Sequence, residues 1–164
     1  MDELLDLVNE KDEVIGEVWK SEAHNNPQII HREIAILLTD DKHRVLLQQR
    51  SKLKKLKPGY WTIASSGHIK KGEEPEIAAH RELFEELGFD TELKFVKKSF
   101  MQSANESRFF YHYFGKYNKR DFVLQIKEVE QVKYFNISEF LELEKTGRIE
   151  ELSGKWCKEY WGIK

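Results

Sequence analysis

The stretch GHIKKGEEPEIAAHRELFEELGFD, residues 67–90, crowds three carboxylates into the end of a predicted helix. Pro75 suits the first helical position, and Gly88 suits the position just past the last turn. Glu82 and Glu86 are then four residues apart with like charge, and they lie where the helix dipole disfavours anions. No cation stands one turn after them in the sequence. We therefore expect another positive charge to balance these carboxylates.

A helical wheel separates two faces of this predicted helix. At about 100° per residue, the apolar residues share one side and the glutamates gather on another. The apolar set is Ile77, Ala79, Leu83, Phe84 and Leu87, and the acidic set is Glu82, Glu85 and Glu86. We expect the apolar side to pack on a sheet, with the carboxylates lining a surface or cleft beside it. His80 falls in the apolar arc and is interpreted as a packing residue.

Length and composition predict a single domain over residues 1–164. The chain is 40% hydrophobic, and domains of roughly 100–200 residues are usual. A formal net charge of −2 argues against a general nucleic-acid or membrane-surface binder. The single cysteine, Cys157, excludes an internal disulfide and fits a reducing compartment. We interpret it as a packing residue near Trp156 and Trp161.

The start of the chain, MDELLDLVNEKDEV, is acidic and lacks the regions of a signal peptide. No apolar run approaches the ~20 residues of a membrane span. We expect a soluble cytoplasmic protein that does not enter a membrane. The sequence leaves the oligomeric state open, with a homodimer as one option.

Alternating apolar residues predict a sheet around the central helix. Residues 138–147 are expected to form a second helix, capped by Ser138 and ended by Gly147. The expected strands fall within residues 4–18, 33–50, 56–69, 107–117 and 129–137. This mixture predicts an α/β or α+β fold with one mixed sheet.

Three carboxylates on one helical face make an oxygen-rich site that suits Mg²⁺ or Mn²⁺. The alternative interpretation is a solvated acidic face. The pattern of residues 67–89 decides between them, because it resembles the Nudix box, G-x5-E-x7-R-E-U-x-E-E-x-G-U, where U is apolar. The matching residues are Gly67, Glu73, Arg81, Glu82, Leu83, Glu85, Glu86, Gly88 and Phe89.

This resemblance implies a Nudix-type α/β/α sandwich with a central mixed β-sheet. It also implies hydrolysis of a diphosphate linked to another moiety, with Mg²⁺ or Mn²⁺ as cofactor. By family role, Glu82, Glu85 and Glu86 hold the metal, together with the carbonyl of Gly67. Glu73 and Arg81 resemble the structural ion pair that braces the loop against the helix.

Segments 12–24, 31–38, 45–62 and 66–73 are similar to the isopentenyl-diphosphate isomerases and the Nudix hydrolases nearest to them. The isomerases hold a metal with three histidines and two glutamates. His24, His31 and His68 match the histidines, and Glu128 matches one glutamate, while the place of the other holds Ile126. We expect the three histidines to meet in space with Glu128 nearby. The catalytic cysteine of the isomerases falls at Ser66.

A serine hydroxyl is a far weaker acid than a thiol, and moving a double bond needs an acid and a base across the substrate. The sequence therefore favours a hydrolase, with an isomerase as the alternative. A diphosphate-binding module without turnover is the third class. The substrate stays open among nucleoside di- or triphosphates, nucleotide sugars, dinucleotides and non-nucleotide diphosphates.

Three further sets of residues have two interpretations each. Glu128 is either a general base or metal ligand, or a surface residue at a strand end. Arg50, Lys54, Lys55 and Lys57 either meet substrate phosphates or form a solvated basic loop. Phe109, Tyr111 and Tyr113 share one strand face and either stack a base or belong to the core.

Overall fold

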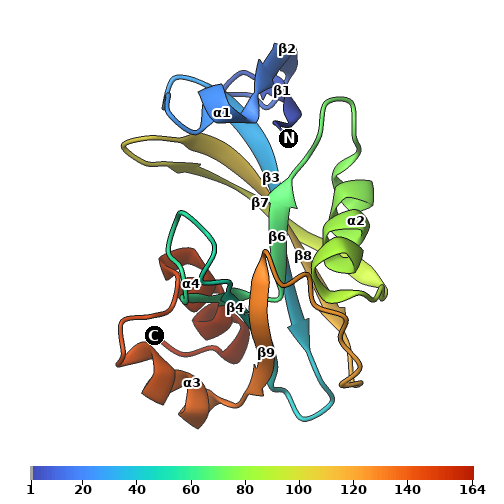
Figure 1. The fold of residues 1–164 in the computed structure, drawn as a ribbon, viewed down its shortest axis with the longest axis vertical. Helices are drawn as coiled ribbons and strands as arrows, with labels where there is room; N and C mark the ends of the chain where they lie inside the picture. Colours follow the sequence, from blue (N-terminus) through green and yellow to red (C-terminus); the bar gives the residue numbers. More distant parts are fainter. Residues whose placement is uncertain (1) are drawn as a thin grey trace.

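The computed structural model describes residues 2–164, which form one mixed β-sheet with helices on both sides (Figure 1). The strands are β1 (Leu4–Val8), β2 (Val14–Trp19), β3 (Ile30–Thr39), β4 (Val45–Arg50), β5 (Trp61–Ile63), β6 (Ser65–His68), β7 (Leu93–Gln102), β8 (Ser107–Lys116) and β9 (Val129–Phe135). The helices are α1 (Lys20–Ala23), α2 (Pro75–Leu87), α3 (Ile137–Glu144) and α4 (Glu151–Trp161). Among these helices, none is both long and apolar enough to cross a membrane.

Strand β3 organises the sheet. It pairs antiparallel with β1, β4 and β6 and parallel with β8. Strand β7 extends the sheet from β8, and β9 extends it from β4. The predicted mixed sheet is therefore confirmed, although β7 and α4 were absent from the sequence-based prediction.

The two faces of β3 bury different layers because successive side chains alternate. Ile34, Ile36 and Leu38 pack in one core cluster with Leu83 and Leu87 of α2. On the other face, Leu37 packs in a second cluster with residues of α3 and α4, including Phe140, Trp156 and Cys157. Figure 1 shows α2 on one side of the sheet and α3 with α4 on the other. The α/β/α arrangement is as expected.

Cys157 is completely buried in the second cluster beside Trp156, with Trp161 packed against the same cluster. Burial raises the pKa of its thiol to about 12. The packing interpretation of this cysteine therefore agrees with its surroundings.

Helix α2 presents a different face to the sheet from the one that the wheel predicts. Ile77 and Phe84 were expected to be buried, but they are 60% and 62% exposed. Glu86 was expected on the open acidic face, but it is 8% exposed. The buried face follows Ala79, Leu83, Glu86 and Leu87, because a polar region of the sheet beneath the C-terminal turn accepts the glutamate.

Two local predictions near helix ends were wrong. His80 does not pack in the core: it is half-buried, and its Nδ1 lies 2.5 Å from Oδ1 of Asp90. Helix α3 begins after Asn136 rather than Ser138, because Asn136 accepts from the backbone N–H of Glu139 at 2.9 Å. The Glu139 carboxylate accepts in return from the backbone N–H of Asn136, which completes a capping box.

Gly88 ends α2 in a left-handed conformation, as the sequence predicts, and the following chain returns against it. Its φ is +75°, and an added Cβ would lie 2.5 Å from Cβ of Val123. The backbone N–H of Val123 donates to the carbonyl of Leu87 at 2.9 Å, so this neighbour is fixed. Glycine is therefore required here both by conformation and by space.

Replacing Gly88 with Ala should lower the free energy of unfolding by about 2 kcal/mol or more, because the left-handed cost of roughly 1 kcal/mol adds to overpacking. The matched control is Gly147→Ala, since Gly147 has a φ of +66° but nothing within 4 Å of the added Cβ. Urea denaturation measures both variants. Equal losses in the two would contradict the role of the Val123 contact.

Candidate functional site

Arg81 braces the loop before α2 against the helix. Its Nε and Nη2 donate to the two carboxylate oxygens of Glu73 at 2.8 and 2.9 Å, which is a bidentate pair. Nη2 also donates to the carbonyl of His68 at 2.9 Å, and so ties the helix to the end of β6. The expected ion pair between Glu73 and Arg81 is present.

Arg81 also supplies positive charge that the sequence predicts to come from a bound cation. Its Nη1 lies 2.6 Å from Oε1 of Glu82 and 3.3 Å from Oε2 of Glu85. Glu85 stays 44% exposed, whereas Glu82 is 12% exposed. Burial raises the pKa of Glu82, although Arg81 opposes that change. Two of the three carboxylates therefore have a partner within the chain.

Gly67 lies directly under Glu82. A Cβ at this position would lie 2.2 Å from the carboxyl carbon of Glu82, so any other residue would force the Glu82 carboxylate out of its position beside Arg81. Strand β6 and α2 therefore approach closely at this point. The main chain of Gly67 therefore lies close to the Glu82 carboxylate.

Glu86 lacks a cationic partner among the described residues. Its Oε2 accepts from Nε2 of Gln48 at 3.0 Å, which is a neutral contact. Burial, together with the charge of Glu82, raises the pKa of Glu86 to about 8, and the neutral side chains of Ser65 and Gln48 offset only part of this shift. Glu86 is thus the buried carboxyl of α2 that is costly to ionise without a cation.

The carboxylates of Glu82, Glu85 and Glu86 are oxygen donors of the kind that Mg²⁺ and Mn²⁺ prefer. They do not converge within 4.8 Å of one another in this structure, since among the described residues only His24, His31, Glu33 and His68 do so. The side-chain oxygen of Gln48 is buried beside Glu86 without a hydrogen-bond partner in the described chain. Glu86 therefore has no positive charge beside it, and the side-chain oxygen of Gln48 has no donor. A bound cation with its water molecules would supply both.

The predicted phosphate-binding residues contact other groups than the glutamates of α2. Nε of Arg50 donates to the carbonyl of Leu56 at 3.2 Å, within its own loop. Nζ of Lys57 lies 3.3 Å from a carboxylate oxygen of Glu150. Lys54 forms an ion pair with Glu128, and Lys55 is exposed. This loop therefore presents cations near the edge of the sheet, with Lys54 already paired.

Glu128 lies between the loop and the acidic helix. Its side chain is 35% exposed, and its charge contributes to the raised pKa of Glu86. The preceding segment is fixed to α2, since the backbone N–H of Gln125 donates to the carbonyl of Glu86 at 3.0 Å. Glu128 is thus held beside the glutamates, in the region where a base is expected.

Strand β6 presents two kinds of residue on its two sides. Gly67 pairs with Ile34 and faces Glu82, so this side is the α2 side. Ser66 and His68 alternate with Gly67, and they pair with Ala35 and Glu33 on the opposite face of β3. The acidic face of α2 and the residues around His68 are therefore separated by the thickness of one strand.

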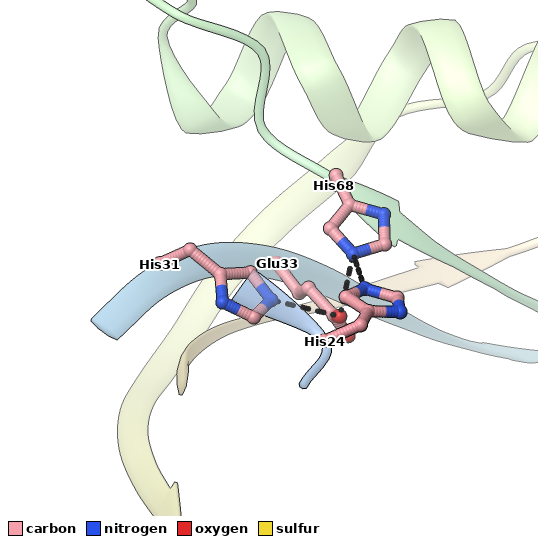
Figure 2. A group of neighbouring side chains, drawn as sticks. All are labelled: His24, His31, Glu33 and His68. Atoms are coloured by element: carbon pink, nitrogen blue, oxygen red, sulfur yellow. Dashed lines mark hydrogen bonds and ion pairs between the residues drawn. The ribbon is translucent and has the colours of Figure 1, made fainter. Parts of the chain in front are cut away.

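Three histidines meet on this second face, as the spacing predicts (Figure 2). His24 follows α1, His31 lies on β3 and His68 ends β6. Nε2 of His24 is 2.8 Å from Nε2 of His68, and the ring centroids of His31 and His68 are 5.4 Å apart. Both ring nitrogens of His31 are buried without a hydrogen-bond partner in the described chain. These nitrogens are available to a ligand.

The sequence-based prediction missed Glu33, a carboxylate that belongs to this histidine cluster. Oε1 of Glu33 lies 3.1 Å from Nε2 of His68 and 3.5 Å from Nε2 of His31. The ligand atoms of His24, His31, Glu33 and His68 all fall within 4.8 Å of one another. The position of Glu33 two residues after His31 on a strand is a signal that could have found it. Nitrogen and carboxylate donors of this kind suit Zn²⁺ or a similar transition metal.

Glu128 and Ile126 were therefore assigned wrongly to the histidines. A second carboxylate at the cluster comes from Glu106, with Oε1 3.8 Å from Nδ1 of His24. Ile126 is 74% exposed, and Glu128 instead pairs with Lys54 on the acidic side. The error arises because Glu106 reaches the histidines through the pairing of β3 with β8, which is not local in sequence.

Phe109, Tyr111 and Tyr113 share a strand face, as expected, and they belong to the core. Phe109 is 7% exposed and Tyr113 is 4% exposed. The hydroxyl of Tyr111 donates to Asp12 in the turn between β1 and β2. The core interpretation accounts for these side chains.

The three-layer fold and the strand, loop and acidic helix at residues 67–89 define the class of domain to which this chain belongs. The NUDIX domain family model matches residues 30–154, about three quarters of the sequence. The chain is a member of the Nudix family.

Relatives carry two kinds of name. A Photorhabdus laumondii protein named isopentenyl-diphosphate Delta-isomerase 2 is 36% identical over 143 residues, 84% of this chain and 79% of that protein. A Listeria monocytogenes protein named an uncharacterized Nudix hydrolase is 30% identical over 143 residues, 87% of this chain and 85% of that protein. A solved structure from Deinococcus radiodurans has a TM-score of 0.80 at 20% identity, covering 97% of this chain and 99% of that one. This likeness concerns the fold alone.

Glu86 should make the metal-free protein less stable as the pH rises. The pKa of Glu86 is raised to about 8 in the fold from an ordinary 4.5, so the folded state keeps a proton that the unfolded state releases between these values. Stability from this group is complete below about pH 4.5 and lost as the pH approaches 8. In EDTA, the free energy of unfolding of Glu86→Gln should therefore rise relative to that of the natural protein by on the order of 2–4 kcal/mol between pH 5 and pH 8.

Denaturant unfolding at several pH values measures this difference. The matched control is Glu85→Gln, because Glu85 is 44% exposed on the same helix and should show a much smaller gain. A Glu86→Gln difference that stays constant from pH 5 to pH 8 would contradict the buried-carboxyl explanation.

Proposed function

We propose that this protein is a divalent-metal-dependent hydrolase that cleaves a diphosphate linkage in a nucleoside diphosphate derivative or a related compound. The observation that carries the proposal is the buried Glu86, which has a raised pKa and no cation beside it. A domain that keeps such a group next to Glu82 and Gly67 retains an arrangement costly to stability unless a cation binds. The complete Nudix box at residues 67–89 also supports a metal-dependent hydrolase.

Glu82, Glu85, Glu86 and the carbonyl of Gly67 would hold Mg²⁺ or Mn²⁺. When bound, such a cation neutralises diphosphate oxygens, orients the attacking water and lowers its pKa. Arg81 keeps Glu82 and Glu85 in place through its contacts with both carboxylates. Glu73 in turn keeps Arg81 in place.

Glu128 is the proposed general base, since it lies beside the acidic face and is partly exposed to water. A carboxylate in this position can accept a proton from water during attack on a phosphorus atom. Lys54 pairs with Glu128, and Arg50 and Lys57 lie in or near the same loop. These cations would attract an anionic diphosphate and hold its oxygens.

Glu86→Gln and Glu85→Gln should each lower kcat by orders of magnitude, because each removes a carboxylate from the metal-binding face. The assay is phosphate or nucleotide release over a panel of diphosphate compounds, with Mg²⁺ and with Mn²⁺, and with mass-spectrometric identification of products. Glu76→Gln is the matched control, since Glu76 is exposed in the first turn of the same helix. Normal turnover by Glu86→Gln, or in excess EDTA, would rule out the proposed site.

Isomerisation of isopentenyl diphosphate is the second candidate function. The name of the Photorhabdus laumondii relative and the cluster of His24, His31 and His68 favour it. Ser66 lies on the same side of β6 as His68, at the place of the cysteine in the isomerases. A hydroxyl there is a much poorer proton donor than a thiol of pKa about 8.5, which favours the hydrolase.

Isopentenyl diphosphate should not be converted to dimethylallyl diphosphate at a useful rate. The measurement is incubation in deuterated water, followed by product analysis and by mass spectrometry for incorporated deuterium. The control is the same incubation without protein. Incorporation at about 1 s⁻¹ or more, a typical kcat, would reverse the order of the two candidates.

A further inference from the structure

An arginine enters the histidine cluster from the neighbouring strand. Arg108 lies on β8, opposite His31 in the parallel pairing of β3 with β8. Its Nη1 is 2.9 Å from Oε1 of Glu33 and 2.8 Å from Oε2 of Glu106. The guanidinium also lies over the ring of Phe110, 5.0 Å from its centroid. Packing and two ion pairs therefore fix this side chain.

The same carboxylate oxygen of Glu33 faces both Arg108 and the histidines. Oε1 is 3.1 Å from Nε2 of His68 and 2.9 Å from Nη1 of Arg108. Glu33 is 6% exposed, so water screens this contact poorly. Although burial opposes ionisation, Arg108 and His68 hold the pKa of Glu33 well below its usual range.

We propose that Arg108 is the built-in cation of the histidine cluster: it occupies the two carboxylates that a divalent transition metal would use and so weakens metal binding there. With neutral imidazoles, Glu33, Glu106 and Arg108 give the cluster a net charge of −1, whereas these two carboxylates alone would give −2. Glu3 lies 3.8 Å from Nδ1 of His68 but is paired with Lys20 at 2.8 Å, so this pair leaves the net charge unchanged. A dication about 5 Å from a guanidinium meets repulsion that is ample for a tenfold change in affinity.

This arrangement has a consequence for chemistry on the Ser66 side of the sheet. Arg108 pairs with both Glu33 and Glu106, so both carboxylates already face a cation on this side of the sheet. Ser66 adds only a hydroxyl on the same side, which is a much weaker acid than a thiol. The histidine cluster lies apart from Glu82, Glu85 and Glu86, so its Zn²⁺ affinity can be measured independently of hydrolysis.

The test is the affinity of the purified full-length protein for Zn²⁺, measured by competition with a chromophoric chelator. The visible spectrum of the Co²⁺ protein reports the ligand set. The Zn²⁺ binding that belongs to the cluster is the fraction of total binding that His24→Ala abolishes. His24 is chosen because it is a partly exposed member of the cluster. Arg108→Met, which keeps much of the length of the side chain and removes its charge, should bind Zn²⁺ at least about tenfold more tightly.

Glu106→Gln tests the same idea in the opposite direction. It brings the net charge of the cluster to zero, so Zn²⁺ should bind about tenfold more weakly. The double variant Arg108→Met with Glu106→Gln restores the charge of −1 and should return to nearly the natural affinity. If Arg108 instead served only to orient Glu33 for the metal, Arg108→Met would bind more weakly and the double variant would not recover.

Arg120→Met is the matched control, because Arg120 follows the far end of β8 and pairs with Asp40. Its Zn²⁺ affinity should stay unchanged. Circular dichroism and thermal unfolding verify that each variant is folded. If folded Arg108→Met binds Zn²⁺ no more tightly than the natural protein, the proposal is overturned. Unchanged or tighter Zn²⁺ binding by Glu106→Gln also overturns it, and this second test remains valid even if Arg108→Met does not fold.

Discussion

The hydrogen bonds of Arg81 connect the elements on which both candidate sites depend. One guanidinium holds Glu73 in the loop, Glu82 on the helix and the carbonyl of His68 at the end of β6. The close approach of Gly67 to Glu82 allows this geometry, because a side chain at residue 67 would displace the Glu82 carboxylate from Arg81. The position of His68 on the opposite side of β6 thus depends on the same arginine that orders the acidic helix.

Two buried glutamates, one on each side of the sheet, show how the surroundings decide the state of the same group. Glu86 has no cation beside it, only the neutral side chains of Gln48 and Ser65 and the charges of other glutamates, and its pKa rises to about 8. Glu33 is equally buried, but Arg108 and the imidazole of His68 keep its pKa well below the usual range. Positive charge is therefore lacking at Glu86, although Arg81 pairs with its neighbours, and it is present at Glu33. The two buried carboxyls thus differ in whether the chain itself supplies a cation beside them.

The sequence allowed much of the fold and the acidic site to be predicted, because their signals are local. Alternation marked most strands, and Pro75 and Gly88 marked the ends of α2 correctly. The rotation of α2 was wrong, since the wheel ranks residues by hydrophobicity and cannot know that Gln48 lies beneath Glu86. Strand β7 was missed because its exposed edge carries Lys and Ser among apolar residues.

The histidine cluster marks where sequence reasoning stops and tertiary structure becomes necessary. Its three histidines were found through a resemblance in spacing, and Glu33 could have been found from the period of a strand. Arg108 and Glu106 had no such signal, because they reach the cluster only through the parallel pairing of β3 with β8, more than seventy residues apart. Parallel pairing has no short turn to fix its register, so the charge of the cluster follows from tertiary structure alone.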